Sequence, residues 1–427
     1  MRLPRPPTRP LIDNLLSNYG YIGFLALIPV FVVPLYLRLL GTAVWGNVAL
    51  CLTLQGFLFL LDMAVGPLML RDVARAAVGA QAPSAYRRFL RIYAGTAAVV
   101  FVVGLATLAS VAEYRRFHAE PISADILRAL CLALVQFLFQ FSNNAAIGYW
   151  NGLERQRLAN LRLAGFTLAK HAVALIFLMT WSASATAYMA AFALVAVIEF
   201  ALNYRRVRGD SSAVFVDAPA QRPHDALGYA IAAMLGFATA QIDRGYLALS
   251  LPGPDYGLYF LIGVPMLTLF SLQMPIQRAY LPRLATASAP HRIAASMLML
   301  SCGLIVLPSL LLAAFPATAL SLWLHNPELA ARGAPTFRLL MLAMAMNAVF
   351  APASLLLLNR HRNATIGALN TLILLVQIAL LITLTPRLGM LAGAVAWLAC
   401  GLIQLVSMPM IWRAFGGPES EGASTFL

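Results

Sequence analysis

The chain has 427 residues, of which 61% are hydrophobic and only 11% are charged. A soluble domain usually carries about 25% charged residues, and one this apolar would expose more hydrophobic surface than water tolerates. The formal net charge is +14, but the arginines lie between apolar stretches and form no single basic patch, which argues against a nucleic-acid partner. The composition therefore predicts a protein whose solvent is membrane lipid.

Apolar stretches follow one another along the chain, each long enough for a helix that crosses a bilayer. Because a spanning helix satisfies its own backbone polar groups, each stretch is predicted to be helical. Their approximate bounds are 17–40, 44–66, 92–112, 125–149, 160–181, 185–204, 227–250, 256–280, 293–315, 337–358, 364–385 and 389–412. We therefore expect an all-α polytopic membrane protein with about 12 transmembrane helices.

Prolines inside these stretches predict kinks or local unwinding, because proline lacks the backbone N–H of a helical hydrogen bond. They are Pro29, Pro34, Pro265, Pro308 and Pro352.

The two halves of the chain resemble each other. Val44-Trp45-Gly46 is matched by Asp255-Tyr256-Gly257, 211 residues later, and Leu68–Arg71 is matched by Ala279–Pro282 at the same offset. Their shared order favours duplication of a six-helix unit. Since six is even, both halves enter the membrane from the same side, so the pseudo-two-fold axis between the two bundles would run along the membrane normal.

The expected organisation follows from these spans. It comprises a cytoplasmic N-terminal tail (1–16), an N-terminal six-helix bundle (17–208), a cytoplasmic linker (209–225), a C-terminal six-helix bundle (226–413) and a cytoplasmic C-terminal tail (414–427).

Arginine distribution predicts the orientation of the chain. If the N-terminus lies inside, 21 of the arginines fall in inside segments and 6 in outside segments. Lys and Arg concentrate in cytoplasmic loops. We therefore expect a multi-pass membrane protein with both termini in the cytoplasm.

A polar stripe runs along the fourth predicted span. Gln136, Gln140, Asn143 and Asn144 recur there at helical spacing. Amide side chains in a membrane either form hydrogen bonds between helices or line a polar cavity. Both interpretations stay open, and the second makes Gln136, Gln140 and Asn143 candidate substrate ligands.

The fifth span carries Lys170, the only lysine of the chain, followed by His171. Ionisable groups within lipid are costly and usually functional, and Lys and His can both change charge when they are buried. Anion binding or proton coupling is one interpretation. A contact with a backbone carbonyl or with Glu199 is the structural alternative.

Acidic and basic groups mark four other spans, the second, the seventh, the eighth and the first. Asp62 shares a helix face with Asn47 and Gln55, and either contributes to ion coupling or pairs with Arg71 or Arg75.

The seventh span carries Gln241, Asp243 and Arg244, and the adjacent charges are expected to serve different partners. They are candidates for gating and substrate binding, or for a structural pair that bridges the halves.

Gln273, Gln277 and Arg278 are spaced to line a cavity from the eighth span, although Arg278 is also placed to mark the cytoplasmic membrane edge. Arg38 ends the first span, either as a gating residue or as an anchor that snorkels to the interface.

No enzyme motif occurs. The chain lacks G-x-S-x-G, a Walker loop and H-E-x-x-H, and its histidines lie far apart in the sequence. We expect neither catalysis, nor a cofactor, nor a metal.

Several motifs together resemble those of a known family. They are Pro34-Leu35-Tyr36-Leu37-Arg38-Leu39-Leu40-Gly41 leading to Trp45-Gly46, then Gln241-Ile242-Asp243-Arg244, Asp255-Tyr256-Gly257-Leu258-Tyr259, and Leu388-Gly389 before Gly393-Ala394-Val395-Ala396. Their order and the predicted topology resemble the polysaccharide-transporter (O-antigen flippase) branch of the multidrug/oligosaccharidyl-lipid/polysaccharide (MOP) exporter superfamily.

That resemblance implies two six-helix bundles and alternating access, with ion-gradient coupling in several members. It also implies that undecaprenyl-diphosphate-linked oligosaccharide, an O-antigen or exopolysaccharide repeat unit, is moved across the inner membrane. Polysaccharide polymerase and glycosyltransferases would then be partners. Lys170, Arg244 or Arg278 would meet the phosphates, and the amides would suit sugar hydroxyls.

Two alternatives stay open. An ion-coupled multidrug efflux transporter of the same superfamily would expect acidic groups to dominate the cavity, yet the acids within spans are few: Asp62, Glu199 and Asp243. A membrane glycosyl polymerase or ligase would need a large outside loop with catalytic groups, and the longest outside segments, about 113–124 and 316–336, are short.

Overall fold

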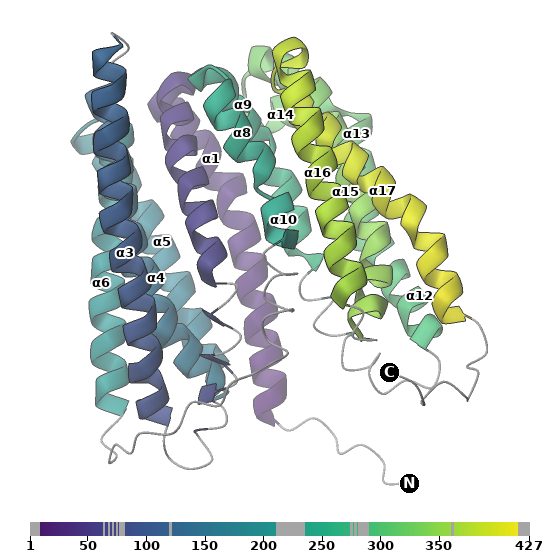
Figure 1. Cartoon of the computed structure of the whole chain (residues 1–427), viewed down its shortest axis with the longest axis horizontal. Coiled ribbons are helices and arrows are strands. Elements are labelled where there is room, and N and C mark those ends of the chain that lie inside the picture. Colours follow the sequence, from purple (N-terminus) through teal and green to yellow (C-terminus); the bar gives the residue numbers. More distant parts are fainter. Residues whose placement is uncertain are drawn as a thin grey trace. The chain divides into compact units, whose positions relative to one another are not determined.

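The computed structural model describes residues 9–62, 65–66, 69–70, 72–73, 76, 82–118, 122–210, 235–273, 276, 280, 290–359 and 363–416. Every regular element in this part is a helix (Figure 1). Among the described residues, nine helices are long and apolar enough to cross a membrane. The predicted all-α polytopic class is confirmed.

The predicted spans can be followed in these helices. The first candidate, Gly23–Leu61, covers two predicted stretches, and eight others follow between Ala82 and Ile411. The stretches at 227–250 and 256–280 contain shorter helices, α8 (Ile242–Ser250), α9 (Gly253–Ile262) and α10 (Val264–Ser271). Leu251 and Pro252 separate α8 from α9, and neither helix is long enough to count as a span.

Internal packing divides the chain into two compact units, Met1–Leu261 and Ile262–Leu427. The division lies beyond the expected linker because α8 packs on α1 (Arg9–Leu58) within the first unit. Most of the linker at 209–225, half of the N-terminal tail and most of the C-terminal tail lie outside the described residues, and α1 begins within the N-terminal tail, at Arg9. The proposed domain bounds therefore stay predictions.

Helix α1 is two helices joined by a kink. Gly41 has φ 69° and ψ 172°, which is non-helical. A glycine adopts a positive φ without the steric penalty of a Cβ. Gly41 falls in the break expected between the first two spans, and the short 3₁₀ helix η1 (Phe59–Leu61) follows α1.

Four long helices complete most of the first unit: α3 (Ala82–Phe117), α4 (Ala124–Gly152), α5 (Gln156–Thr180) and α6 (Ala185–Asp210). Helix α4 packs against both α3 and α6, while α5 packs against α6 and α1 (Figure 1). Tyr93 of α3 packs on Phe141 of α4, and Phe137 and Trp150 of α4 are buried in the same cluster. Helix α4 is therefore central in this unit.

The second unit is built around α15 (Pro327–Asn359). Helices α17 (Leu391–Gly416), α14 (Pro316–Leu324), α13 (Leu307–Ala314) and α12 (Pro290–Ser301) all pack against α15. Helix α16 (Asn363–Leu388) packs mainly against α17 (Figure 1). Of the most apolar stretch of α15, 67% is buried, more than in any other candidate span of the described residues.

The interior prolines coincide with two local breaks. Pro265 lies in the first turn of α10, directly after the interruption at Gly263. Pro308 lies in the first turn of α13, and the π-helix η2 (Cys302–Val306) precedes it. A π-turn accommodates the backbone carbonyl that a proline leaves without its usual donor. Pro29, Pro34 and Pro352, in contrast, lie within helices that continue through them, so the helix breaks expected at these three prolines do not occur.

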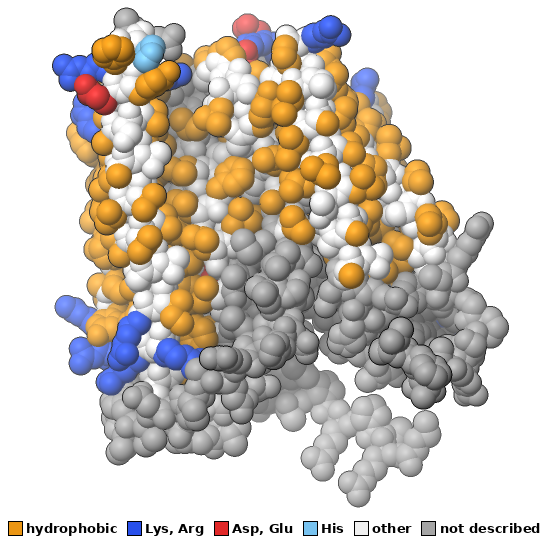
Figure 2. Space-filling model, viewed as in Figure 1, with side chains coloured by type: hydrophobic (Ala, Val, Ile, Leu, Met, Phe, Trp, Pro, Cys, Tyr) orange, Lys and Arg blue, Asp and Glu red, His pale blue; other side chains and the backbone are white. Residues whose placement is uncertain are grey.

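The surface has the character of a membrane protein. Figure 2 shows exposed hydrophobic side chains along the helices and Lys or Arg side chains near their ends. On α3, Val99, Val102 and Val103 are more than half exposed. A soluble protein would not expose such a band, so lipid must cover it.

Candidate functional site

A buried ion pair joins α5 to α6. The Lys170 ammonium donates to Glu199 Oε2 over 2.8 Å and also to Gln140 Oε1. Lys170 is 8% exposed and Glu199 is 1% exposed. Of the alternatives that the sequence leaves open, the contact with Glu199 is the one that the structure contains.

The pair continues into a chain of hydrogen bonds. Asn143 donates from Nδ2 to Glu199 Oε1 over 2.9 Å, and Asn203 donates from Nδ2 to Asn143 Oδ1 over 2.7 Å. The Nε–H of Arg162 donates in turn to Asn203 Oδ1. We call the resulting set the α4–α5–α6 network: Gln140, Asn143, Arg162, Lys170, Glu199 and Asn203.

Helical spacing explains why these side chains meet. Glu199 and Asn203 are four residues apart on α6, and Gln140 and Asn143 are three apart on α4, so each pair shares one face. Arg162 and Lys170 are eight apart on α5, slightly more than two turns. Three helices thus present one polar face each to a common interior.

The network carries two cations and one carboxylate. Arg162 also lies over the ring of Trp150, 5.6 Å from its centroid. Loss of the negative charge at Glu199 would leave Lys170 and Arg162 without a charged counterion in this set. The network therefore carries one more positive than negative charge, an excess that favours an anion nearby.

Two further contacts join α1 to the helices that carry the network. Gln136 Oε1 accepts from Gln55 Nε2 over 2.6 Å, which links α4 to α1. The Tyr36 hydroxyl lies 2.9 Å from His171 Nδ1, which links α1 to α5. Gln136 and His171 therefore have interhelical partners of their own, on the same helices as network residues but outside the network.

Among the described residues, Asp62 has an aromatic hydroxyl as a partner. Its Oδ1 accepts a hydrogen bond from the Tyr93 hydroxyl over 2.6 Å, and Asn144 adds a further side-chain hydrogen bond. Arg71 and Arg75, the alternatives considered from the sequence, lie outside the described residues.

Asp243 and Arg244 point to neighbouring residues of α9. Asp243 Oδ2 accepts from the Tyr259 hydroxyl, and the Arg244 guanidinium lies 4.8 Å from the centroid of the Phe260 ring. Both charged residues are at most 8% exposed. Asp243 and Arg244 thus contact different partners. Neither residue is a member of the α4–α5–α6 network as defined above.

The second unit contains a smaller amide chain. Gln273 donates to Asn347 Oδ1 over 3.1 Å, and Asn347 donates to Gln404 Oε1 over 3.1 Å. Gln277 and Arg278 lie outside the described residues, and Arg38 on α1 is exposed.

Sequence reasoning missed Arg162, Asn203, Asn347 and Gln404 as polar partners. Asn203 carries a usable signal, because it follows Glu199 by one helical turn. Arg162 looks like an ordinary arginine at the membrane edge, and only its contact with Asn203 joins it to the network.

No family model and no curated protein matches the chain. Solved structures share its fold. A MATE multidrug transporter, DinF-BH, superposes with a TM-score of 0.66 at 14% identity, over 98% of this chain and 100% of that one.

Two other structures agree with this match. An outward-facing multidrug resistance MATE family transporter of the MOP superfamily gives a TM-score of 0.61 at 12% identity, over 95% of this chain and 94% of that one. A MOP superfamily transporter from Pyrococcus furiosus, described as having a binding pocket of reverse polarity that suggests a different function, gives 0.59 at 13% identity, over 95% of both chains.

The chain has the fold of MOP superfamily transporters. At identities of 12–14% the likeness establishes the fold alone. The polysaccharide-transporter branch of that superfamily stays a prediction.

Proposed function

We propose that this chain is an exporter of the bacterial inner membrane that works by alternating access and couples export to an ion gradient. The observation that carries this proposal is the buried Lys170–Glu199 pair within a hydrogen-bonded network of three helices. Ionisable groups are expensive in lipid, and those that are retained there usually serve binding or coupling.

A proton at Glu199 would change the contacts of all three helices. The neutral carboxyl no longer attracts the Lys170 ammonium, which then keeps only the neutral acceptor Gln140 in this network. Asn143 bridges Glu199 and Asn203, so the change reaches α4 and α6 together. A switch needs such a local charge change and an element that it biases.

The comparisons favour multidrug efflux over the predicted oligosaccharide flippase, because two of the solved structures that share the fold are multidrug transporters. We therefore propose amphiphilic small molecules as the first substrate class. In the described part of the first unit, Asp62, Glu199 and Asp243 are acidic groups positioned within or beside spans and available to an ion-coupled pump.

The charge of the network supports a second candidate. Two cations and several amides suit the phosphates and sugar hydroxyls of a lipid-linked oligosaccharide, which matches the predicted flippase. Polysaccharide polymerase and glycosyltransferases would be partners in that case. A binding pocket of reverse polarity has been described for one transporter of this fold, so charge can differ within it.

The coupling is tested with purified protein in liposomes that carry an imposed pH gradient. Export of a fluorescent lipophilic cation is measured for the wild type, Glu199→Gln and the control Glu113→Gln, whose side chain is 75% exposed on α3. We expect Glu199→Gln to lose the gradient-dependent part of transport and the control to keep it. Equal gradient dependence in all three proteins would refute coupling through Glu199.

The substrate class is tested in the same liposomes with a fluorescent polyprenyl-diphosphate oligosaccharide. Translocation of this lipid without transport of the cation would favour the oligosaccharide flippase over multidrug efflux. Transport of the cation alone would exclude the flippase.

A further inference from the structure

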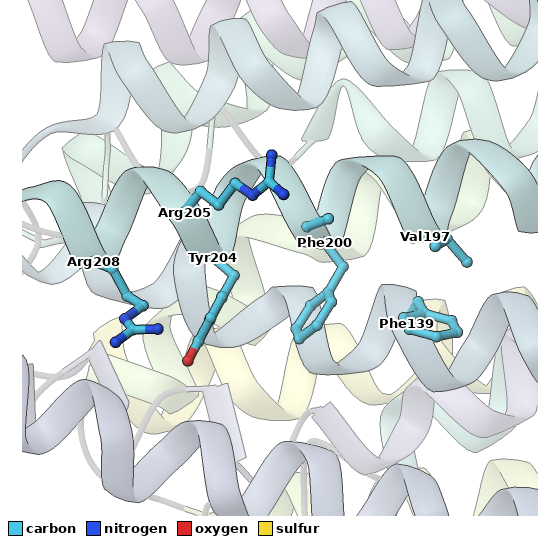
Figure 3. Close-up of a pocket in the computed structure, with 7 residues that line it drawn as sticks. Phe139, Val197, Phe200, Tyr204, Arg205 and Arg208 are labelled. Atoms are coloured by element: carbon cyan, nitrogen blue, oxygen red, sulfur yellow. The ribbon is translucent and has the colours of Figure 1, made fainter.

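A pocket follows one face of α6 at the end that the arginine distribution assigns to the cytoplasm. It has a volume of about 600 Å³ and is lined by Phe139 of α4 and by Val197, Phe200, Ala201, Tyr204, Arg205 and Arg208 of α6 (Figure 3). The α6 residues recur at intervals of three and four, so they form one stripe along the helix. Glu199 and Asn203 face the buried network instead.

The stripe changes character along its length. Val197, Phe200 and Ala201 come first, Tyr204 follows, and the two arginines are last. The Phe200 ring stacks on Tyr204 with centroids 6.1 Å apart, and the Arg208 guanidinium lies 5.6 Å from the Tyr204 centroid. Apolar, aromatic and basic residues in this order match the acyl chain, interface and headgroup layers of a bilayer.

A second pocket adjoins the first. It has a volume of about 480 Å³, shares Tyr204 and Arg208 with the first pocket, and adds Tyr86, Arg87 and Arg91 from the first turns of α3. Of the described residues that line the two pockets, four are arginines and none is acidic. Arg87 and Arg91 are one helical turn apart and share a face.

From this juxtaposition we propose that the α3–α6 arginine pocket, comprising Arg87, Arg91, Arg205 and Arg208 with Tyr204, binds the headgroup of an anionic phospholipid of the cytoplasmic leaflet. The fatty acyl chain lies along Val197, Phe200 and Ala201. Charge complementarity favours this occupant, because guanidinium groups form paired hydrogen bonds with phosphate oxygens. The adjoining apolar stripe can bury an acyl chain, which a soluble anion lacks.

The site is separate from the proposed transport network and is independent of the transported substrate. Helix α6 carries Glu199 and Asn203 on one face and this stripe on another. A lipid bound to the stripe would therefore stabilise the position of α6, which contributes two residues to the network. A zwitterionic phospholipid lacks the net negative charge that the four arginines attract.

The test is lipid titration of the delipidated full-length protein, followed by native mass spectrometry. We expect phosphatidylglycerol to bind the wild type more tightly than phosphatidylcholine. Arg205→Gln with Arg208→Gln should weaken phosphatidylglycerol binding about 25-fold, since each arginine near the surface contributes about fivefold. The matched control, Arg115→Gln with Arg116→Gln, removes the same charge at the opposite end of α3 and should bind as the wild type does.

A second variant tests the apolar part of the site and does not depend on the folding of the double arginine variant. Ala201→Trp fills the apolar stripe and should lower phosphatidylglycerol binding, while the binding of inorganic phosphate stays unchanged. Inorganic phosphate or glycerol phosphate binding as tightly as the lipid would overturn a lipid site in favour of a site for soluble anions. Unchanged phosphatidylglycerol binding in the folded Arg205→Gln/Arg208→Gln variant would overturn the location.

Discussion

Gly46 of α1 and Gly257 of α9 lie directly against each other. A Cβ built on Gly257 would stand 2.9 Å from the Gly46 nitrogen, and one on Gly46 would overlap the Gly253 carbonyl oxygen. Gly46 and Gly257 are 211 positions apart, which is the offset at which the halves of the chain resemble each other. Both glycines lie within the first compact unit, Met1–Leu261, where α1 and α9 meet at this pair.

Glycine allows this close approach, because small residues let helix backbones touch in a membrane. We expect Gly46→Ala to cost about 1–3 kcal/mol, the usual penalty of overpacking. Thermal unfolding in detergent measures it. The control is Gly95→Ala on α3, where a Cβ meets nothing within 4 Å; it should be neutral or stabilising, since alanine favours helix. Equal stability of both variants would contradict the close packing.

The fold was largely predictable from the sequence, because hydrocarbon permits only long apolar helices and each one leaves a plain signal. The break at Gly41 and the interruptions next to Pro265 and Pro308 follow from the same local rules.

The site was predictable only in part, because partners depend on how helices rotate about their axes. Lys170 and Glu199 can be recognised in the sequence, because charged residues within spans are rare. Tyr93, the partner of Asp62, cannot be told from any other aromatic residue of a lipid-facing helix. Arg162 stands near the start of its predicted span, where an arginine is expected in any case, so its part in the network left no signal in the sequence.

Substitutions of Lys170 and of Glu199 should have strongly non-additive effects on the free energy of unfolding. Removing one partner leaves the other as a buried unpaired charge, so we expect Lys170→Met to cost about 3–5 kcal/mol. Adding Glu199→Gln to that variant should recover most of the loss, since the amide oxygen can still accept from Asn143. A double-mutant cycle on unfolding free energies measures the coupling. Losses that simply add would show that the two charges do not pair.

Tyr36 should contribute one hydrogen bond beyond its packing. Tyr36→Phe keeps the ring, which packs against Trp45 and Tyr188, but removes the hydroxyl that contacts His171. We expect a loss of about 0.5–1.5 kcal/mol, measured by thermal unfolding. Tyr114→Phe on α3, whose side chain is 65% exposed, is the matched control and should leave stability unchanged.

The orientation of the first unit can be tested with single cysteines at opposite membrane surfaces. Once Cys51, Cys131, Cys302 and Cys400 have been replaced, Glu113→Cys reports the end of α3 and Arg157→Cys the start of α5; both native side chains are exposed. Because positive loops stay in the cytoplasm, a membrane-impermeant maleimide added to intact cells should label Glu113→Cys. It should label Arg157→Cys only after permeabilisation, and both equally in detergent. The reverse pattern would invert the topology and would move the α3–α6 arginine pocket to the outer leaflet.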